Sequence, residues 1–279
     1  MMNLLSVDWM RARKAWFFWV MLIIAAAVSM LVFQENYSMI IAEIQDGKSW
    51  PMESAFFQFP ILTGALLSAF IPLFLGADYS DGTIRNKLIA GHQRSSIYGS
   101  YLLTTLISSC ILNVVILVVN IAISLLNGGK MSMDGCQLSV YLCTAFCCSF
   151  AFASLFVLIS TQITNRAFSS VASIGITLLM FLLSSKLISE LNISPEARDL
   201  LTLVDGKPVY SNPYPNPMYV SGVKRTLIEV LVDLLPAGQS IQISNLEADR
   251  INRFPMLSAL FILLTSGIGV FAFRKKDIR

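Results

Sequence analysis

Charged residues are scarce in this sequence. Only 13% of its 279 residues are Asp, Glu, Lys or Arg, whereas 55% are hydrophobic and the mean hydropathy is +0.68. Soluble domains carry about 25% charged residues, and disordered chains combine low hydrophobicity with high charge. The composition therefore excludes both classes and predicts an integral membrane protein. The net charge of +3 is too small to indicate a basic surface that binds nucleic acid.

Residues that carry catalysis or bind metals are also few. The chain has one histidine, His92, and its five cysteines lack the spacing of a metal site. It contains no G-x-S-x-G or H-E-x-x-H motif and no phosphate-binding G-x-x-x-x-G-K-[ST] loop. We therefore expect no catalytic residue, no metal and no cofactor on this chain. A membrane enzyme would need facing ionisable residues within its spans, and the sequence offers none.

Six apolar runs are long enough to cross a bilayer as helices, which takes about 20 residues each. The runs are continuous rather than alternating, which excludes a membrane barrel and predicts an all-α integral membrane fold with six transmembrane helices. Within them the only ionisable residue is Lys186, close enough to a span end to reach the interface. Ion-coupled transport is thereby disfavoured. The six runs are 15–33, 55–75, 97–126, 138–160, 168–188 and 254–273.

The distribution of Lys and Arg predicts the orientation. Segments 1–14, 76–96, 161–167 and 274–279 hold eleven basic residues, whereas the short loops 34–54 and 127–137 hold two. Basic residues favour the cytoplasmic side, so we expect a multi-pass protein of the cell membrane with both termini in the cytoplasm.

The chain divides into four parts. Residues 1–14 are predicted as an amphipathic interfacial helix, 15–188 hold spans one to five, 189–253 form an external region, and 254–279 hold span six with a basic tail. A cleaved secretory signal is the weaker interpretation of the start, since the first apolar run is long and no small-residue cleavage site follows.

Two helices are predicted in the external region. One starts at Ser194-Pro195-Glu196. The other covers 221–235, is too short to span the bilayer, and is therefore interfacial or re-entrant. Between them, the proline-rich segment 212–217 is predicted as a loop.

The loop between spans two and three predicts a short helix with exposed apolar residues. Asp81-Gly82 is a turn signal, Thr83 is a suitable N-cap, and Gly91 is a preferred C-terminal cap for a helix over 83–90. Two helical turns have little core of their own, so the apolar side chains need a partner surface, and the basic ones suit an acidic partner. The apolar residues are Ile84, Leu88 and Ile89, and the basic ones Arg85, Lys87 and Arg94.

This loop resembles the coupling helix of ABC-2 type transporter permeases. The matching residues are Asp78-Tyr79, where many relatives have Glu at the first position, then 82–89, Gly91, Arg94 and Ile97-Tyr98. The basic amphipathic start, the six spans, the stretch 234–239 and the tail 273–278 also fit that family. The resemblance implies a cytoplasmic ABC ATPase partner that carries the ATP and Mg. Its contact would be formed by Thr83, Ile84, Arg85, Asn86, Lys87, Leu88, Ile89 and Arg94.

The resemblance also implies a second permease copy, either identical or a close paralogue, facing this one across the second and fifth spans. On the second span, Phe56, Phe59 and Thr63 share a helical face, which forms either a gate against that copy or a plain lipid contact. An apolar lining predicts hydrophobic or amphipathic cargo, with an exported peptide as the first expectation. The alternative is a non-transporting immunity or sensor protein that binds a toxin through 189–253.

Overall fold

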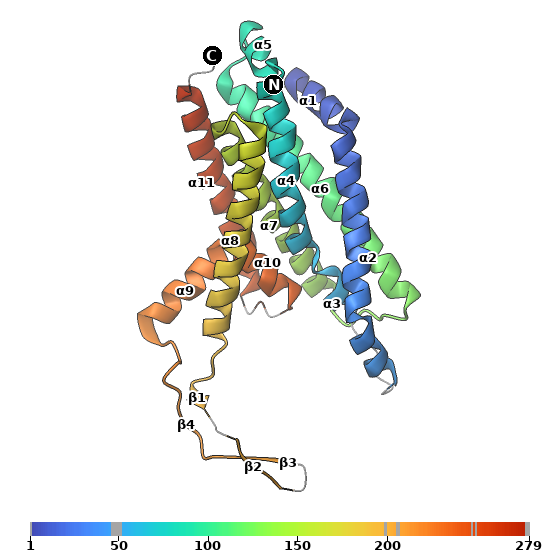
Figure 1. The fold of residues 1–279 in the computed structure, drawn as a ribbon, viewed down its shortest axis with the longest axis vertical. Coiled ribbons are helices and arrows are strands. Elements are labelled where there is room, and N and C mark those ends of the chain that lie inside the picture. The colour runs from blue at the N-terminus through green and yellow to red at the C-terminus, as the bar shows by residue number, and fades with distance from the viewer. Residues whose placement is uncertain are drawn as a thin grey trace.

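The computed structural model describes residues 2–45, 52–197, 200–204, 207–246, 248 and 250–276. For 2–3, 35–45, 54, 56, 200–204 and 207–210 it describes the backbone only. The described chain is a bundle with six helices that are long and apolar enough to cross a membrane (Figure 1). The predicted all-α membrane fold is therefore confirmed. The six are α2 (Trp16–Gln45), α4 (Phe59–Ser80), α6 (Arg94–Leu126), α7 (Gly135–Gln162), α8 (Arg166–Leu191) and α11 (Phe254–Lys275).

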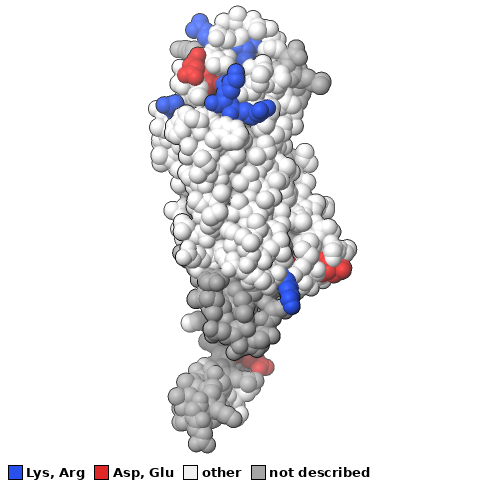
Figure 2. All heavy atoms as spheres, turned by 90° about the vertical axis from the view of Figure 1, so that its right-hand side faces the viewer, with Lys and Arg blue, Asp and Glu red and all other residues white. Residues whose placement is uncertain are grey.

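Shorter elements occupy the two ends of the bundle. The end with the described chain termini, here called the terminal end, carries α1 (Met2–Lys14) and α5 (Thr83–Ile89). The opposite end, here called the far end, carries α3 (Glu53–Phe56), α9 (Gly222–Leu234), α10 (Pro236–Ser244) and the short helix η1 (Ile251–Arg253). On the face in Figure 2, charged side chains gather at the two ends and the broad middle carries none. This band fits the hydrocarbon layer of a bilayer.

Helices α4 and α7 form the centre of the bundle. In α4, 67% of the most apolar stretch is buried, against 17% in α8. The centre is filled by aromatic rings, and α4 packs closely against the start of α8 because Gly76 has no side chain. A Cβ at Gly76 would lie 2.3 Å from the Cβ of Arg166. The buried face of α8 is made of small and flexible residues, which let helices approach closely: Ser169, Ser173, Thr177, Met180 and Ser184.

At the terminal end of the bundle, two basic side chains bind the carbonyl groups at the C-termini of helices. The Arg94 guanidinium donates to the carbonyl oxygens of Phe273, Arg274 and Lys276 after the last turn of α11. The Lys276 ammonium donates to the carbonyls of Thr161 and Gln162 at the end of α7, at 2.7 and 2.9 Å. Cations are stabilising at helix C-termini because the last carbonyls are unpaired and the dipole is negative there.

At the far end the structure corrects the first predicted external helix. Glu196–Ala197 forms strand β1, which pairs antiparallel with β4 (Tyr214–Pro215), inside the predicted loop 212–217. Strands β2 (Leu200–Val204) and β3 (Lys207–Tyr210) form a second antiparallel pair in an arm that projects from the bundle. Proline is tolerated both at the start of a helix and in an extended chain, so the local sequence around Pro195 could not distinguish a helix from a strand.

The second external helix is observed as α9, and a further helix follows it. Pro236 does not end the segment but starts α10, since proline is well tolerated in a first helical turn. Residues 236–240 are buried, and α10 packs against α4, α7 and α8. Gln239 holds this helix in place by accepting a hydrogen bond of 2.6 Å from Ser258 of α11. Helix α10 is therefore packed into the end of the bundle.

Two other boundaries differ from the sequence prediction. Helix α2 continues to Gln45, beyond the predicted end at 33. The second apolar run is split, because α3 ends at Phe56 and α4 begins only at Phe59, one residue before Pro60. Helix α4 then continues to Ser80, five residues past the apolar run.

The bundle separates Gln93 and Lys130 onto opposite ends, which permits a test of orientation. In a variant without native cysteines, we expect an impermeant thiol reagent to label Lys130→Cys in intact cells. We expect it to label Gln93→Cys only after permeabilisation, since the Lys and Arg bias places the terminal end inside. Both side chains are exposed. Equal labelling of the two positions in intact cells would contradict the orientation.

Candidate functional site

The predicted coupling segment folds as the short helix α5, Thr83–Ile89. Its N-cap is Gly82 rather than Thr83, and no side chain caps the helix. Gly82 has φ of 67°, in the left-handed region where glycine lacks the steric penalty of other residues. This turn directs α5 away from the end of α4.

The predicted contact set divides between two faces of α5. Ile84 and Lys87 are buried, with 1% and 6% exposure, so they are not available to a partner in this structure. Leu88 is half-buried against the core. Arg85, Asn86 and Ile89 face outward, and Ile89 is 76% exposed.

The two remaining members of the set also differ in their positions. Thr83 is half-buried at the start of α5. Arg94 lies outside α5 and binds the end of α11. The predicted basic docking face is thus reduced to Arg85, because Lys87 and Arg94 have partners within the subunit.

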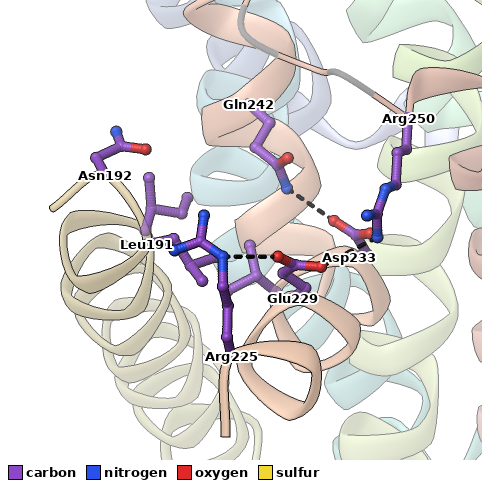
Figure 3. Close-up of a pocket in the computed structure, with 9 residues that line it drawn as sticks. Leu191, Asn192, Arg225, Glu229, Asp233, Gln242 and Arg250 are labelled. Atoms are coloured by element: carbon purple, nitrogen blue, oxygen red, sulfur yellow. Dashed lines mark hydrogen bonds and ion pairs between the residues drawn. The ribbon is translucent and has the colours of Figure 1, made fainter. Parts of the chain in front are cut away.

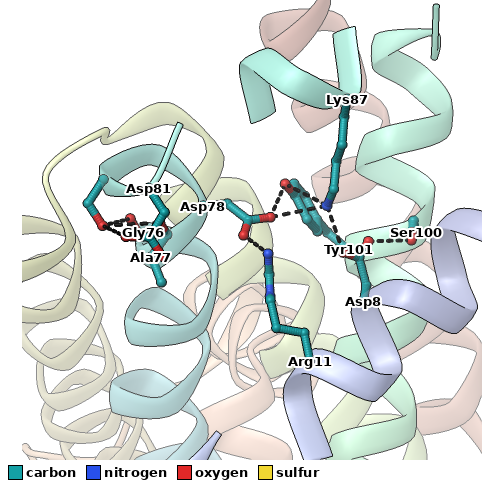
Figure 4. Close-up of polar contacts among 10 residues, drawn as sticks. Asp8, Arg11, Gly76, Ala77, Asp78, Asp81, Lys87, Ser100 and Tyr101 are labelled. Atoms are coloured by element: carbon teal, nitrogen blue, oxygen red, sulfur yellow. Dashed lines mark hydrogen bonds and ion pairs between the residues drawn. The ribbon is translucent and has the colours of Figure 1, made fainter. Parts of the chain in front are cut away.

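Lys87 enters a buried cluster of ionised and hydroxyl groups between α1, α4, α5 and α6 (Figure 4). The Lys87 ammonium lies 2.6 Å from Oδ1 of Asp8 and 3.1 Å from Oδ2 of Asp78. Arg11 forms an ion pair with the other oxygen of Asp78. The cluster, here called the ionic cluster, consists of Asp8, Arg11, Asp78, Lys87, Ser100 and Tyr101.

Hydroxyl groups of α6 complete the ionic cluster. The Tyr101 hydroxyl donates to Oδ2 of Asp78 at 2.5 Å, and the Ser100 hydroxyl donates to Oδ2 of Asp8 at 2.6 Å. The Lys87 ammonium also lies 4.5 Å from the centre of the Tyr101 ring. Each carboxylate therefore has both a cationic and a hydroxyl partner, as buried charges require.

The ionic cluster balances two carboxylates against two cations. Burial lowers the pKa of Lys87, and the neighbouring Asp8 carboxylate opposes that shift. Burial likewise lowers the pKa of Arg11, again opposed by Asp8. The Asp8 carboxylate thus helps to keep both groups cationic, and removing any one of the four ionised members leaves the others with unbalanced charge.

Sequence reasoning placed Asp78 in the loop after the second span, because the apolar run ends at Leu75, and it placed Lys87 in the contact with a partner ATPase. One signal was nevertheless present in the first segment. Leu4, Asp8 and Ala12 recur at four-residue spacing and are all buried on one face of α1. An Asp in the middle of an apolar helical face predicts a buried cationic partner.

The predicted gate residues do not lie on a free face of the second span. Phe59 and Thr63 are both fully buried within this subunit. Phe59 packs against Phe146 of α7, and Thr63 donates a hydrogen bond of 2.6 Å to Asn113 of α6. Phe56 belongs to α3, and its side chain lies outside the described part. Because the helix breaks between Phe56 and Phe59, the helical spacing of 56, 59 and 63 no longer predicts a shared face.

A polar cavity of about 440 Å³ lies at the far end, between the last turn of α8 and helices α9 and α10 (Figure 3). Its polar lining consists of Asn192, Arg225, Glu229, Asp233, Gln242 and Arg250. Sequence analysis missed it because these residues come from α9, from α10 and from two positions beside α8 and η1 that are far apart in the sequence. Among the described residues, no group of three His, Cys, Asp or Glu side chains is placed to hold a metal ion.

The ionic cluster generates a stability prediction. Lys87→Met leaves two buried carboxylates with one cation, and breaking a buried ion pair costs about 3–5 kcal/mol. We expect a clear fall in the thermal unfolding midpoint of the purified protein in detergent. Arg85→Met, an exposed change on the same helix, is the matched control and should shift stability by about 0.5 kcal/mol or less. Equal midpoints for the two variants would disprove a structural role for the cluster.

Comparison with known proteins does not assign the chain to a family. No protein-family model matches the chain, and no curated protein matches it. The interpretation of both ends of the bundle therefore depends on the contacts described above.

Proposed function

We propose that this protein is the membrane subunit of an ATP-driven exporter and that α5 is its contact with a separate cytoplasmic ATPase. The observation that carries the proposal is the two-faced geometry of α5. Its inner face is bound to the bundle by Lys87, whereas Arg85, Asn86 and Ile89 face outward at the terminal end. An exposed Ile beside an Arg on a seven-residue helix suits a protein partner with apolar and acidic groups.

The ionic cluster supports a mechanical role for this contact. Lys87 connects α5 to α1 through Asp8 and to α4 through Asp78, and Tyr101 connects the same site to α6. A force on the outer face of α5 would therefore move the ends of three neighbouring helices together. The ion pairs among the described side chains lie at the two ends of the bundle rather than in its apolar middle, so ATP hydrolysis on a partner fits better than coupling to an ion gradient.

The exposed face of α8 supports pairing with a second permease copy. Val171, Leu178 and Leu182 are each at least 60% exposed, and α8 is the least buried of the six spanning helices. Such a face suits a second copy, identical or closely related, and otherwise contacts lipid. The substrate expected from the family resemblance is hydrophobic or amphipathic, with a peptide as the first candidate.

A second candidate function is favoured by the arm at the far end. Strands β1 to β4 project beyond the bundle, away from the spanning helices. An immunity or sensor protein would bind a toxin there without an ATPase. Co-purification of an ATPase with the chain distinguishes the exporter from this alternative.

The proposal predicts that the outer face of α5 controls ATPase association. We expect Arg85→Glu combined with Ile89→Glu to abolish co-purification of the ATPase from detergent-solubilised membranes, because both replacements oppose an apolar and acidic partner surface. Folding should persist, since both side chains are exposed. Arg274→Glu is the control, because Arg274 is exposed at the same end but on α11.

Retention of the ATPase by the double variant, with wild-type yield and unfolding midpoint, would exclude α5 as the contact. Loss of the ATPase by Arg274→Glu to the same degree would show that the effect comes from surface charge at this end rather than from α5.

A further inference from the structure

The far-end cavity lies where a lipid headgroup would be. It is formed at the last turn of α8, which spans the bundle and ends at Leu191. Helix α9 has 13 residues, too few to cross a bilayer. Val223, Leu227 and Val230 of α9 are 57% to 77% exposed, which fits a helix lying in the membrane interface. In that position the cavity would lie at the level of the lipid headgroups.

The charged groups of the cavity are ordered and balanced. Glu229 accepts from Arg225 Nε at 3.2 Å and from Arg250 Nη1 at 3.1 Å. Gln242 donates to Oδ1 of Asp233 at 3.2 Å. Two guanidinium groups thus face two carboxylates, so a ligand without net charge fits best.

Arg225 has a donor that the protein does not use. Its guanidinium is held by Glu229 and by the ring of Tyr219, which lies 5.3 Å away. Its Nη1 is buried and has no hydrogen-bond partner. A buried donor left unpaired is costly, and an anionic oxygen is the partner that a guanidinium binds best.

We propose that this cavity binds a phosphoethanolamine group, with its phosphate on Arg225 and Arg250 and its primary ammonium on Asp233. The group has no net charge, matching the balanced lining. Burial raises the pKa of Asp233, with Gln242 opposing the shift, and an ammonium beside this carboxylate would favour its ionised form. The proposal is independent of the export function, since such a site serves any membrane protein.

Two related headgroups fit less well. Phosphocholine has a quaternary ammonium without N–H donors, which proteins bind with aromatic rings, and none of the described lining residues is aromatic. Phosphoglycerol is anionic and brings no ammonium group to Asp233, so its charge does not match the balanced lining. The apolar lining residues Ile188, Leu191 and Val232 suit the start of the acyl chains when the group belongs to a phospholipid.

The test is a titration of the delipidated full chain in detergent, read by native mass spectrometry. Phosphatidylethanolamine, phosphatidylcholine and phosphatidylglycerol are compared at equal concentration. We expect phosphatidylethanolamine to bind about ten-fold more tightly than the other two, and Arg225→Gln to weaken it about ten-fold, as the loss of one charge-assisted contact implies. Asp233→Asn should remove the preference over phosphatidylcholine.

Control variants keep the test independent of folding. Lys130→Gln removes an exposed charge at the same end and should leave binding unchanged. Arg225→Lys retains the cation and should bind better than Arg225→Gln. Displacement by soluble glycerophosphoethanolamine would show that the free group suffices, and failure to displace would assign the site to the lipid. Wild-type binding by a folded Arg225→Gln, or an equal loss in Lys130→Gln, would overturn the proposal.

Discussion

The terminal end depends on one buried arrangement of charges. Lys87 lies between Asp8 and Asp78, and Arg11 and Tyr101 occupy further positions on Asp78. Burying ionised groups is unfavourable unless each finds an opposite charge and hydrogen-bond partners. Helix α1 and the three consecutive helices α4, α5 and α6 therefore have to meet in one geometry. That requirement fixes the position of α5, which has too few residues to hold itself against the bundle by apolar contacts.

Other polar side chains hold the ends of the bundle in similar ways. Arg94 binds carbonyls at the end of α11, and Lys276 binds those at the end of α7. At the far end, the fully buried carboxylate of Glu53 accepts hydrogen bonds from the backbone N–H groups of Ser132 and Met133, at 2.5 and 2.7 Å. The hydrocarbon layer provides no hydrophobic force between helices, so such polar contacts determine how the helix ends are placed.

The two ends present different chemistry to their surroundings. At the terminal end, Arg85 and Ile89 of the short helix α5 face outward, and its inner face is bound to the bundle by the ionic cluster. The far end offers a charge-balanced cavity between α8, α9 and the buried helix α10. Between them, α4 and α7 form a centre in which Thr63 and Ser149 both donate to Asn113.

The sequence alone determined the membrane fold, its six spans and the short helix after the second span, because apolar run length and glycine turns are local properties. It did not determine which charges are buried. Lys87 and Arg94 have the composition of a basic docking loop, yet their partners Asp8 and Phe273 lie more than seventy residues away in the chain. The same limit applies to Phe59 and Thr63, whose helical spacing indicates a shared face but not which residues cover that face. It also applies to Pro236, because a proline can follow the end of one helix or begin the next. Only the packing of α10 against α4, α7 and α8 decided that Pro236 begins a helix. Partner choice depends on long-range packing, which the tertiary structure alone decides.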